Sequence, residues 1–247
     1  MKKRLFFRCA YDGTHYSGWQ KQPNAKTIQG EIEEKLSRLF GNQSVDIVGC
    51  GRTDAGVHAS QSYFHADLPT NFAPDQLRYK LNNMLPLDIA INEIVEVAED
   101  AHARFDATRR TYYYFLHQHK LPFHQNDSWY YPRKLDVEKM NEATQFLLGR
   151  QDFTSFSKLH TDVNNNFCDI SFAEWKHVGD QLRFEIRANR FLRNMVRAIV
   201  GTLLEVGNGS IAPEEVRNII AKEDRGAAGC SVPAKGLFLQ KIKYPYL

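Results

Sequence analysis

The 247-residue chain lacks several features that define common protein classes. Its four cysteines are scattered and form no CxxC pair, which argues against a zinc knuckle, a thioredoxin-like site and a disulfide-stapled secreted fold. It contains no run of about 18 apolar residues, so we expect no membrane span. The apolar stretch near the start is broken at Arg8. This break comes too early for the apolar region of a signal peptide. We therefore expect a soluble, cytoplasmic protein with reduced cysteines.

Cofactor and metal signatures are also missing. The sequence has no GxxxxGK[ST], no GxGxxG and no GxSxG, so it predicts neither a nucleotide cofactor nor a serine-hydrolase elbow. Two histidine groups, His58 with His65 and His117 with His119 and His124, are the candidates for metal ligands. Neither has a carboxylate or cysteine at a suitable spacing. We therefore expect no metal and no cofactor.

The composition of the chain is that of an ordinary globular protein. Hydrophobic residues make up 43% and charged residues 25%, which excludes a mainly disordered, collagenous or coiled-coil chain. Lys and Arg number 32 against 29 Asp and Glu, giving a net charge of +3. That charge is too small to indicate a nucleic-acid partner by itself, so the distribution of the basic residues must decide.

The first half has the hydrophobic patterns of a β-α-β-β-α-β unit. Thr27 is a suitable N-cap for the first helix, and Pro74 is suitable at the first position of the second. The alternation of Arg4, Phe6 and Arg8 with apolar neighbours indicates a half-buried first strand. This order is the split βαβ arrangement. The predicted elements are a strand at 3–10, a helix at 28–40, strands at 45–50 and 60–66, a helix at 74–84 and a strand at 89–97.

The second half is predicted to repeat this topology, without clear sequence identity to the first. Its predicted elements are a strand at 111–117, a helix at 137–148, a hairpin of 170–178 and 181–188, a helix at 191–206, a short helix begun by Pro213 and a strand at 237–243. The sequence thus predicts an α+β protein of two domains, 1–107 and 108–247. We expect their antiparallel sheets side by side, with a central basic cleft.

The segment GRTDAGVHA at 51–59 is the densest candidate for chemistry. Its two glycines permit positive φ or close approach of another backbone, and Asp54 stands between them with Arg52 two residues earlier. One interpretation is a reactive carboxylate on a rigid loop. The other is a β-turn with a surface ion pair, and the spacing alone leaves both open.

Two arginine-rich stretches indicate RNA contacts. Arginines beside Tyr112 and its aromatic neighbours can bind phosphates while a ring stacks on an unpaired base. In the second stretch, Arg193 and Arg197 are spaced to share one face of the helix predicted at 191–206. Arg193 in its first turn would oppose the helix dipole and favour an anionic partner. The alternative, sheet-packed tyrosines with solvated arginines, stays open. The second stretch comprises Arg183, Arg187, Arg190, Arg193 and Arg197.

Blocks from both halves together resemble the tRNA pseudouridine synthase A family. The resemblance extends from end to end of the chain, and the order of the blocks is the family's. They include YDGT at 11–14, GWQ at 18–20, GRTDAGVHA at 51–59, HARF at 102–105, DFTSF at 152–156, FLR at 191–193, MVR at 195–197 and GLFL at 236–239.

The resemblance implies an enzyme that isomerises uridine to pseudouridine at positions 38, 39 and 40 of the tRNA anticodon stem-loop. It implies that Asp54 is the catalytic carboxylate, Tyr112 stacks on the uracil and Arg193 pairs with Asp54. It further implies that Arg52 helps flip the base and that Leu237 binds substrate. The fold implied is two ferredoxin-like halves, working as a homodimer with tRNA and without metal or cofactor.

Two departures and two other functions complete these expectations. Ser62 stands where the family often has Gln, which changes a structural or RNA-facing contact. Cys168 and Asp169 stand where a basic residue often precedes the isoleucine, which bears on tRNA positioning. The alternative functions are an RNA chaperone without catalysis and a metal-dependent nuclease using His58 and His65. Whether Asp54 attacks C1′ or deprotonates C2′ is left open.

Overall fold

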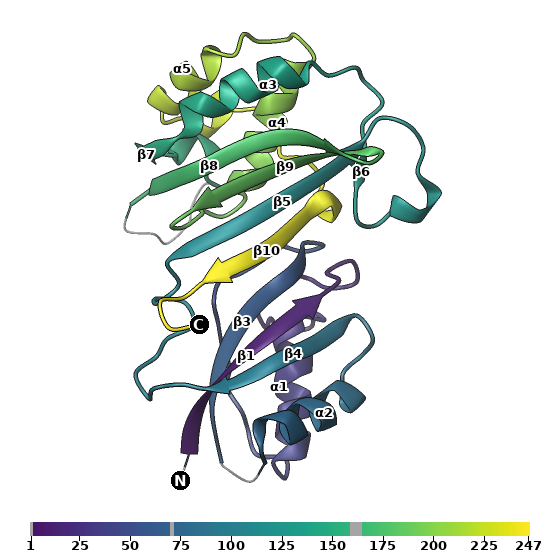
Figure 1. Ribbon diagram of the computed structural model, residues 1–247, viewed down its shortest axis with the longest axis vertical. Helices are drawn as coiled ribbons and strands as arrows, with labels where there is room; N and C mark the ends of the chain where they lie inside the picture. Colours follow the sequence, from purple (N-terminus) through teal and green to yellow (C-terminus); the bar gives the residue numbers. More distant parts are fainter. Residues whose placement is uncertain (1, 70–71, 159–164) are drawn as a thin grey trace. The chain divides into compact units, whose positions relative to one another are not determined.

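A computed structural model describes residues 2–69, 72–158 and 165–247, which group into two compact units. Unit 1 contains the chain up to Thr108 together with Leu239–Leu247, and unit 2 contains Arg109–Phe238. Both units combine helices with antiparallel strands, so the α+β prediction is confirmed (Figure 1). Across the described ranges, no helix is long and apolar enough to cross a membrane.

Unit 1 has the predicted β-α-β-β-α-β order. The long strand β1 lies between β3 and β4 and pairs antiparallel with both, and the short β2 pairs with β3. Strand β10 is the neighbour of β3 on its other side. The elements are β1 (Lys2–Tyr11), α1 (Ile28–Leu39), β2 (Val48–Gly49), β3 (His58–Pro69), α2 (Pro74–Met84), β4 (Ile89–Glu96) and the part of β10 (Leu237–Lys243) from Leu239 onward.

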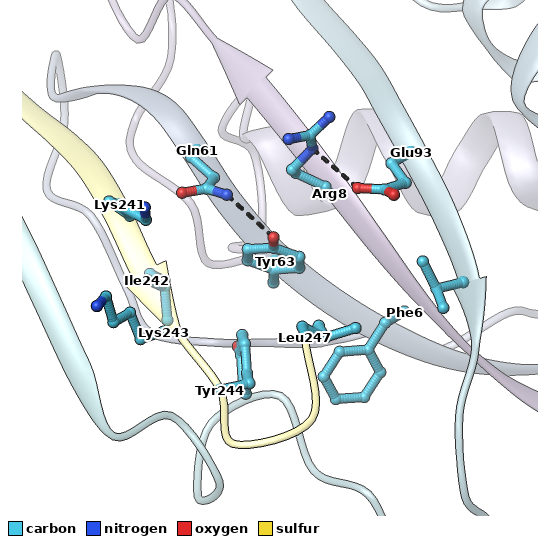
Figure 2. A pocket seen from close by; sticks show the side chains of 11 residues that line it. Phe6, Arg8, Gln61, Tyr63, Glu93, Lys241, Ile242, Lys243, Tyr244 and Leu247 are labelled. Atoms are coloured by element: carbon cyan, nitrogen blue, oxygen red, sulfur yellow. Dashed lines mark hydrogen bonds and ion pairs between the residues drawn. The ribbon is translucent and has the colours of Figure 1, made fainter.

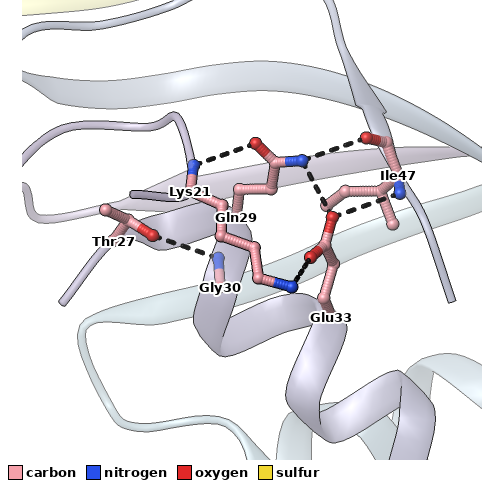
Figure 3. A network of polar contacts seen from close by, with 6 residues as sticks. All are labelled: Lys21, Thr27, Gln29, Gly30, Glu33 and Ile47. Carbon is pink, nitrogen blue, oxygen red and sulfur yellow. Dashed lines mark hydrogen bonds and ion pairs between the residues drawn. The ribbon is translucent and has the colours of Figure 1, made fainter. Parts of the chain in front are cut away.

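Helix α1 is fixed by its cap and by a buried carboxylate. The Thr27 hydroxyl accepts a hydrogen bond from the Gly30 amide, as the sequence predicts for an N-cap. Glu33 is buried and accepts hydrogen bonds from Gln29 Nε2 at 2.8 Å and Lys21 Nζ at 2.9 Å (Figure 3). It also accepts from the Ile47 amide at 3.4 Å, so one side chain ties two loops to the helix.

Strand β1 is half-buried as the sequence predicts, except at Phe6, which is buried although it shares a face with Arg4 and Arg8. Phe7 packs in a stack with Phe64, while Phe6 on the opposite face is also buried. The rings of Tyr244 and Tyr246 pack edge-on against Phe6, at 5.4 and 5.9 Å. This packing groups the last nine residues with unit 1, whereas the division at 107/108 assigned them to the second half.

Unit 2 contains an antiparallel sheet in the order β5-β9-β8-β7, with α3 packed on β8 and α4 packed on α3. Strands β6 and β7, of two and four residues, were not predicted. The elements are β5 (Arg109–His117), β6 (Trp129–Tyr130), α3 (Val137–Thr144), β7 (Gly149–Asp152), β8 (Phe167–Val178), β9 (Gln181–Ala188), α4 (Met195–Gly207) and α5 (Glu215–Ala221), and a single 3₁₀ turn at 145–147 ends the helix predicted to reach 148.

Helix α4 begins at Met195 rather than at 191, and this corrects the interpretation of Arg193. Asn194 has φ +66°, a left-handed conformation that cannot belong to a right-handed helix. Arg193 therefore lies before the helix. It does not share a helical face with Arg197, and the argument from an opposed helix dipole is wrong.

Candidate active site

The loop that carries Asp54 joins β2 to β3 and is held by backbone hydrogen bonds to the segment after β1. The carbonyl of Thr53 accepts from the Trp19 amide at 3.1 Å, and the Gly56 amide donates to the carbonyl of Tyr16 at 3.3 Å. A turn within the loop is closed by the Val57 amide, which donates to the Asp54 carbonyl at 3.2 Å. The Asp54 backbone is thus fixed from both sides.

Two glycines of the opposing segment allow this close approach. A Cβ atom on Gly18 would lie 2.6 Å from the Thr53 carbonyl oxygen, and Gly18 also has φ +92°. A Cβ atom on Gly13 would lie 2.1 Å from the carbonyl oxygen of Val57. No other residue type fits at either position without moving the Asp54 loop.

The side chains around Asp54 differ in exposure. Thr53 is buried, and its hydroxyl lies 2.9 Å from the hydroxyl of the buried Tyr11. Asp54 is half-buried, while Arg52 is exposed and donates from Nε to Gln20 Oε1 at 3.0 Å. The loop is therefore anchored by Thr53 and by backbone contacts.

His58 and His65, two of the histidines singled out as possible metal ligands, contact backbone amides of unit 1. His58 is buried, with Nδ1 3.2 Å from the Gly13 amide and 3.0 Å from Asp12 Oδ1. His65 is buried and accepts a hydrogen bond from the Ala103 amide at 3.1 Å. Burial, with a smaller effect of Arg4, lowers the pKa of His65 to about 4. No group of three potential metal ligands is found in the described ranges.

In unit 2, Tyr112 lies on β5 opposite Ile186 of β9 and is half-buried. Its ring packs edge-on against Phe191, with centroids 5.1 Å apart. Phe191 and Arg193 both lie in the segment between β9 and α4. The contact of Tyr112 with Phe191 therefore joins strand β5 to this segment. Arg193 is exposed, and its carbonyl accepts from the Lys158 amide at 3.0 Å.

Behind this segment, a second backbone contact fixes the start of α4. Arg197 donates from Nε to the Val232 carbonyl at 2.7 Å, and the Val232 amide donates back to the Arg197 carbonyl. Asn194 bonds Ser231 in the same loop. Leu237 is buried at the first position of β10, five residues after Val232.

The predicted site residues thus fall into two groups. Arg52 and Asp54 lie in unit 1, and Tyr112, Arg193 and Leu237 lie in unit 2. The pairing of Arg193 with Asp54 and the shared role of the two groups stay predictions. Sequence reasoning assigned no role to Tyr11 and Gly18, although both lie in quoted blocks, because their contacts with the Asp54 loop join distant segments.

The positions where the chain departs from the family can now be placed. Ser62 is buried, and its hydroxyl lies 3.3 Å from Cys50 Sγ, so this departure concerns a packing contact inside unit 1. Cys168 is buried, whereas Asp169 is exposed. The Asp169 amide donates to Asn189 Oδ1 at 2.9 Å.

A cavity of about 630 Å³ lies elsewhere in unit 1, and it contains none of the predicted site residues (Figure 2). Gln61 donates to the Tyr63 hydroxyl at 3.0 Å within it, and Arg8 lies 3.3 Å from Glu93. Lys241 and Lys243 line it from β10. We do not assign this cavity to catalysis, because none of the predicted site residues lines it.

Comparison with known proteins identifies the family. The sequence pattern of tRNA pseudouridine synthases matches residues 9–106 and 143–245. The chain is 50% identical over 246 residues to tRNA pseudouridine synthase A of Porphyromonas gingivalis, covering 98% of this chain and 97% of the relative. It is 51% identical to that of Parabacteroides distasonis, covering 98% and 96%, and 39% identical to that of Bacillus subtilis, covering 98% and 99%.

The relatives cover nearly the whole chain, and the family pattern covers all of it from residue 9 to 245 except 107–142, where Tyr112 lies. The chain therefore belongs to the tRNA pseudouridine synthase family, and it is an isomerase that acts on uridine in tRNA.

Proposed function

We propose that this chain converts uridine to pseudouridine at positions 38, 39 and 40 of the tRNA anticodon stem-loop. It acts in the cytoplasm as a homodimer and uses neither a metal nor a cofactor. The family blocks at 51–59, 102–105 and 191–193 support this specificity by resemblance. Because the position of the target uridine is a property of tRNA recognition, it needs a direct test.

Asp54 is the catalytic carboxylate of this proposal. The observation that carries it is the immobilised loop, in which Thr53, Gly56 and Val57 are all hydrogen-bonded while the Asp54 side chain is only half-buried. A reactive group needs this combination, because its backbone must be fixed while its carboxylate stays accessible to substrate.

The reaction exchanges one bond of the sugar for another. The bond from C1′ to N1 breaks, the uracil turns, and a bond from C1′ to C5 forms. C5 loses its proton to solvent and N1 gains one, so the atoms balance. Asp54 must be ionised to take part, either as the nucleophile at C1′ or as the base at C2′. A single carboxylate suits an isomerase, since the leaving base is recaptured rather than released.

The other site residues bind and hold the flipped base. Taking a base out of its stack costs a few kcal/mol, and stacking on Tyr112 returns about 1–3 kcal/mol. Arg52 fills the space that the base leaves, and its exposed side chain is available for this. The guanidinium of Arg193 pairs with the Asp54 carboxylate. Leu237 gives the base an apolar contact.

Mapping pseudouridine in an unmodified tRNA transcript tests the proposal. Incubation with the protein should place pseudouridine at 38, 39 and 40 wherever these positions are uridines, in buffer containing EDTA. The Asp54→Asn variant is the matched control. Modification only at other positions would contradict the proposed specificity. Tight tRNA binding without any pseudouridine would favour an RNA chaperone instead.

A further inference from the structure

A turn at residues 102–106 lies in the connection from β4 to β5 and belongs to unit 1 (Figure 1). It presents the ring of Phe105 to solvent, and this side chain is 73% exposed. Single exposed apolar side chains are common on protein surfaces, so the exposure alone indicates nothing. The way in which the turn holds this ring is what points to a function.

Hydrogen bonds fix the backbone on both sides of Phe105. The His102 imidazole accepts at Nδ1 from the amides of Arg104 and Phe105, at 3.1 and 3.3 Å. The Asp106 carboxylate accepts from the His102 amide at 2.6 Å, and the Asp106 amide donates back to the His102 carbonyl at 3.1 Å. The turn is therefore closed on itself by four bonds around the residue that it exposes.

Further bonds attach the turn to the rest of unit 1. The Ala103 amide donates to His65 of β3, and the Ala103 carbonyl accepts from the Tyr244 hydroxyl. The Tyr246 hydroxyl donates to Asp106 Oδ2 at 2.8 Å. The turn is thus fastened to the sheet and to the end of the chain, and Phe105 is carried on a rigid support.

The ring of Phe105 is also held by side chains of its own turn. The His102 ring lies against it, with centroids 4.3 Å apart and planes tilted by 31°, and the Arg104 guanidinium lies 5.7 Å from its centre. Tyr79 on α2 differs: it is 70% exposed, yet no ring contact of it is found among the described residues. A ring that is already held loses less conformational entropy when a ligand covers it.

An unpaired nucleic-acid base is the ligand that fits such a ring. Proteins bind unpaired bases by stacking them on exposed aromatic side chains, often beside arginine. The chain acts on uridine in tRNA, whose loops and 3′ end contain unpaired bases. Phe105 precedes Tyr112 by seven residues, so the chain allows at most about 25 Å between their Cα atoms. Since stacked bases follow one another at about 3.4 Å, a tRNA held at Tyr112 has further nucleotides within that distance.

The charges around the turn favour a base over a phosphate. Glu99 and Asp100 are exposed just before the turn and would repel a phosphate group. The third carboxylate, that of Asp106, is engaged with the backbone of His102. The face of a base is uncharged, so stacking on Phe105 does not bring a negative group against these carboxylates.

We propose that Phe105 is a stacking platform for an unpaired base of the bound tRNA other than the target uridine. The turn and His102 hold the ring in place, and the contact adds affinity for tRNA without taking part in the isomerisation. The inference rests on the proposed function for the role of Tyr112. It is independent of which uridine is modified.

Substitutions that separate an aromatic ring from apolar bulk test this role. Phe105→Ala and Phe105→Leu should each raise the dissociation constant for tRNA about tenfold in a filter-binding assay, whereas Phe105→Trp should keep it close to wild type. The dependence of log Kd on log salt should keep its slope, because no phosphate contact is lost. Tyr79→Ala is the matched control, since it removes a similarly exposed ring from the same unit and should leave the dissociation constant unchanged.

Two further measurements distinguish stacking from a structural role. Phe105→Ala should raise the KM for tRNA about tenfold and leave kcat unchanged, because the contact is the same in the ground state and the transition state. At saturating tRNA it should modify the same uridines as wild type. The fluorescence of Phe105→Trp should be quenched by tRNA more strongly than that of wild type, and this variant decides the matter if Phe105→Ala or Phe105→Leu misfolds.

Wild-type affinity for tRNA in Phe105→Ala or in Phe105→Leu would overturn the proposal, because the ring would then not be needed. An equal loss in Tyr79→Ala, or a smaller salt dependence in the Phe105 variants, would overturn it as well. A changed molecular mass of Phe105→Ala at unchanged tRNA affinity would indicate a protein contact instead. Pseudouridine formation by wild type is measured separately: its absence would reject the proposed function, while the binding assays would still test the platform.

Discussion

The hydroxyl groups of Tyr11 and Thr53 lie 2.9 Å apart in the interior of unit 1. Thr53 is the residue immediately before Asp54. This contact joins the end of β1 to the loop that carries the proposed catalytic carboxylate. Nothing in the spacing of the two residues along the chain indicates it. It is the side-chain counterpart of the backbone bond from Trp19 to Thr53.

Removing either hydroxyl should loosen the loop. We expect Tyr11→Phe and Thr53→Val each to cost about 1 kcal/mol of unfolding free energy in urea. The double variant should cost less than the sum, because both changes remove the same hydrogen bond. The turnover number should fall while the KM for tRNA changes little, since Asp54 is misplaced and the rest of the surface is intact. Thr53→Ser, which keeps the hydroxyl, should retain activity; a loss equal to that of Thr53→Val would contradict this role.

Gly18 should tolerate no side chain. Gly18→Ala adds a Cβ atom 2.6 Å from the Thr53 carbonyl oxygen at a residue with φ +92°. We expect a loss of about 1–3 kcal/mol in thermal or urea unfolding, together with reduced turnover. Gly51→Ala is the matched control, because a Cβ atom there meets nothing within 4 Å. Equal stability of the two variants would show that the loop is not held as tightly as the contacts indicate.

His65 should make stability depend on pH between about 6.5 and 4. Its pKa is about 4 in the folded protein and 6.5 when unperturbed, because burial disfavours the charged imidazolium. The neutral ring therefore stabilises the fold fully above pH 6.5, and this contribution is lost as pH falls through 4. The expected loss is about 2 kcal/mol.

The control for this prediction is His65→Asn. Its amide oxygen can accept from the Ala103 amide as the imidazole does, but it does not titrate. Urea unfolding of the variant should depend less on pH over this range than that of wild type. The same slope in both proteins would assign the effect to other groups.

Substitutions of Tyr112 should separate stacking from folding. Tyr112→Phe keeps the ring and should keep most of the tRNA affinity, whereas Tyr112→Ala should weaken binding by about 1–3 kcal/mol. Because Tyr112 is only half-buried, both variants should fold. If Phe and Ala bind tRNA equally poorly in a filter-binding assay, stacking is not the role of Tyr112.

Local signals explain which parts of the fold the sequence predicts. The predicted limits of α2, which rest on Pro74 and the spacing of Leu77 and Leu81, are those observed. The predicted limits of β10 are also those observed. The predicted start of α4 was wrong because Asn194 has a left-handed backbone conformation, which hydrophobic periodicity does not indicate. The burial of Phe6 was missed because its cover comes from Tyr244, at the far end of the chain.

The candidate site was predicted in part for the same reason. The sequence singles out Asp54 through its flanking glycines, and the loop is as constrained as that pattern predicts. The supports of the loop lie in the segment 11–19, some forty residues earlier, and only the folded chain brings them together. The sequence offers His65 as a possible metal ligand. Its partner in the structure is the Ala103 backbone amide, and no side-chain motif in the sequence indicates such a contact.

The central claim, that Asp54 performs the isomerisation, is tested most directly by proton release from the uracil. A tRNA labelled with tritium at uridine C5 must lose tritium when pseudouridine forms, since that carbon becomes bonded to the sugar. Wild-type protein should release the label, and Asp54→Asn should release none above background while it binds tRNA and melts like wild type. Substantial release by Asp54→Asn would contradict the assignment.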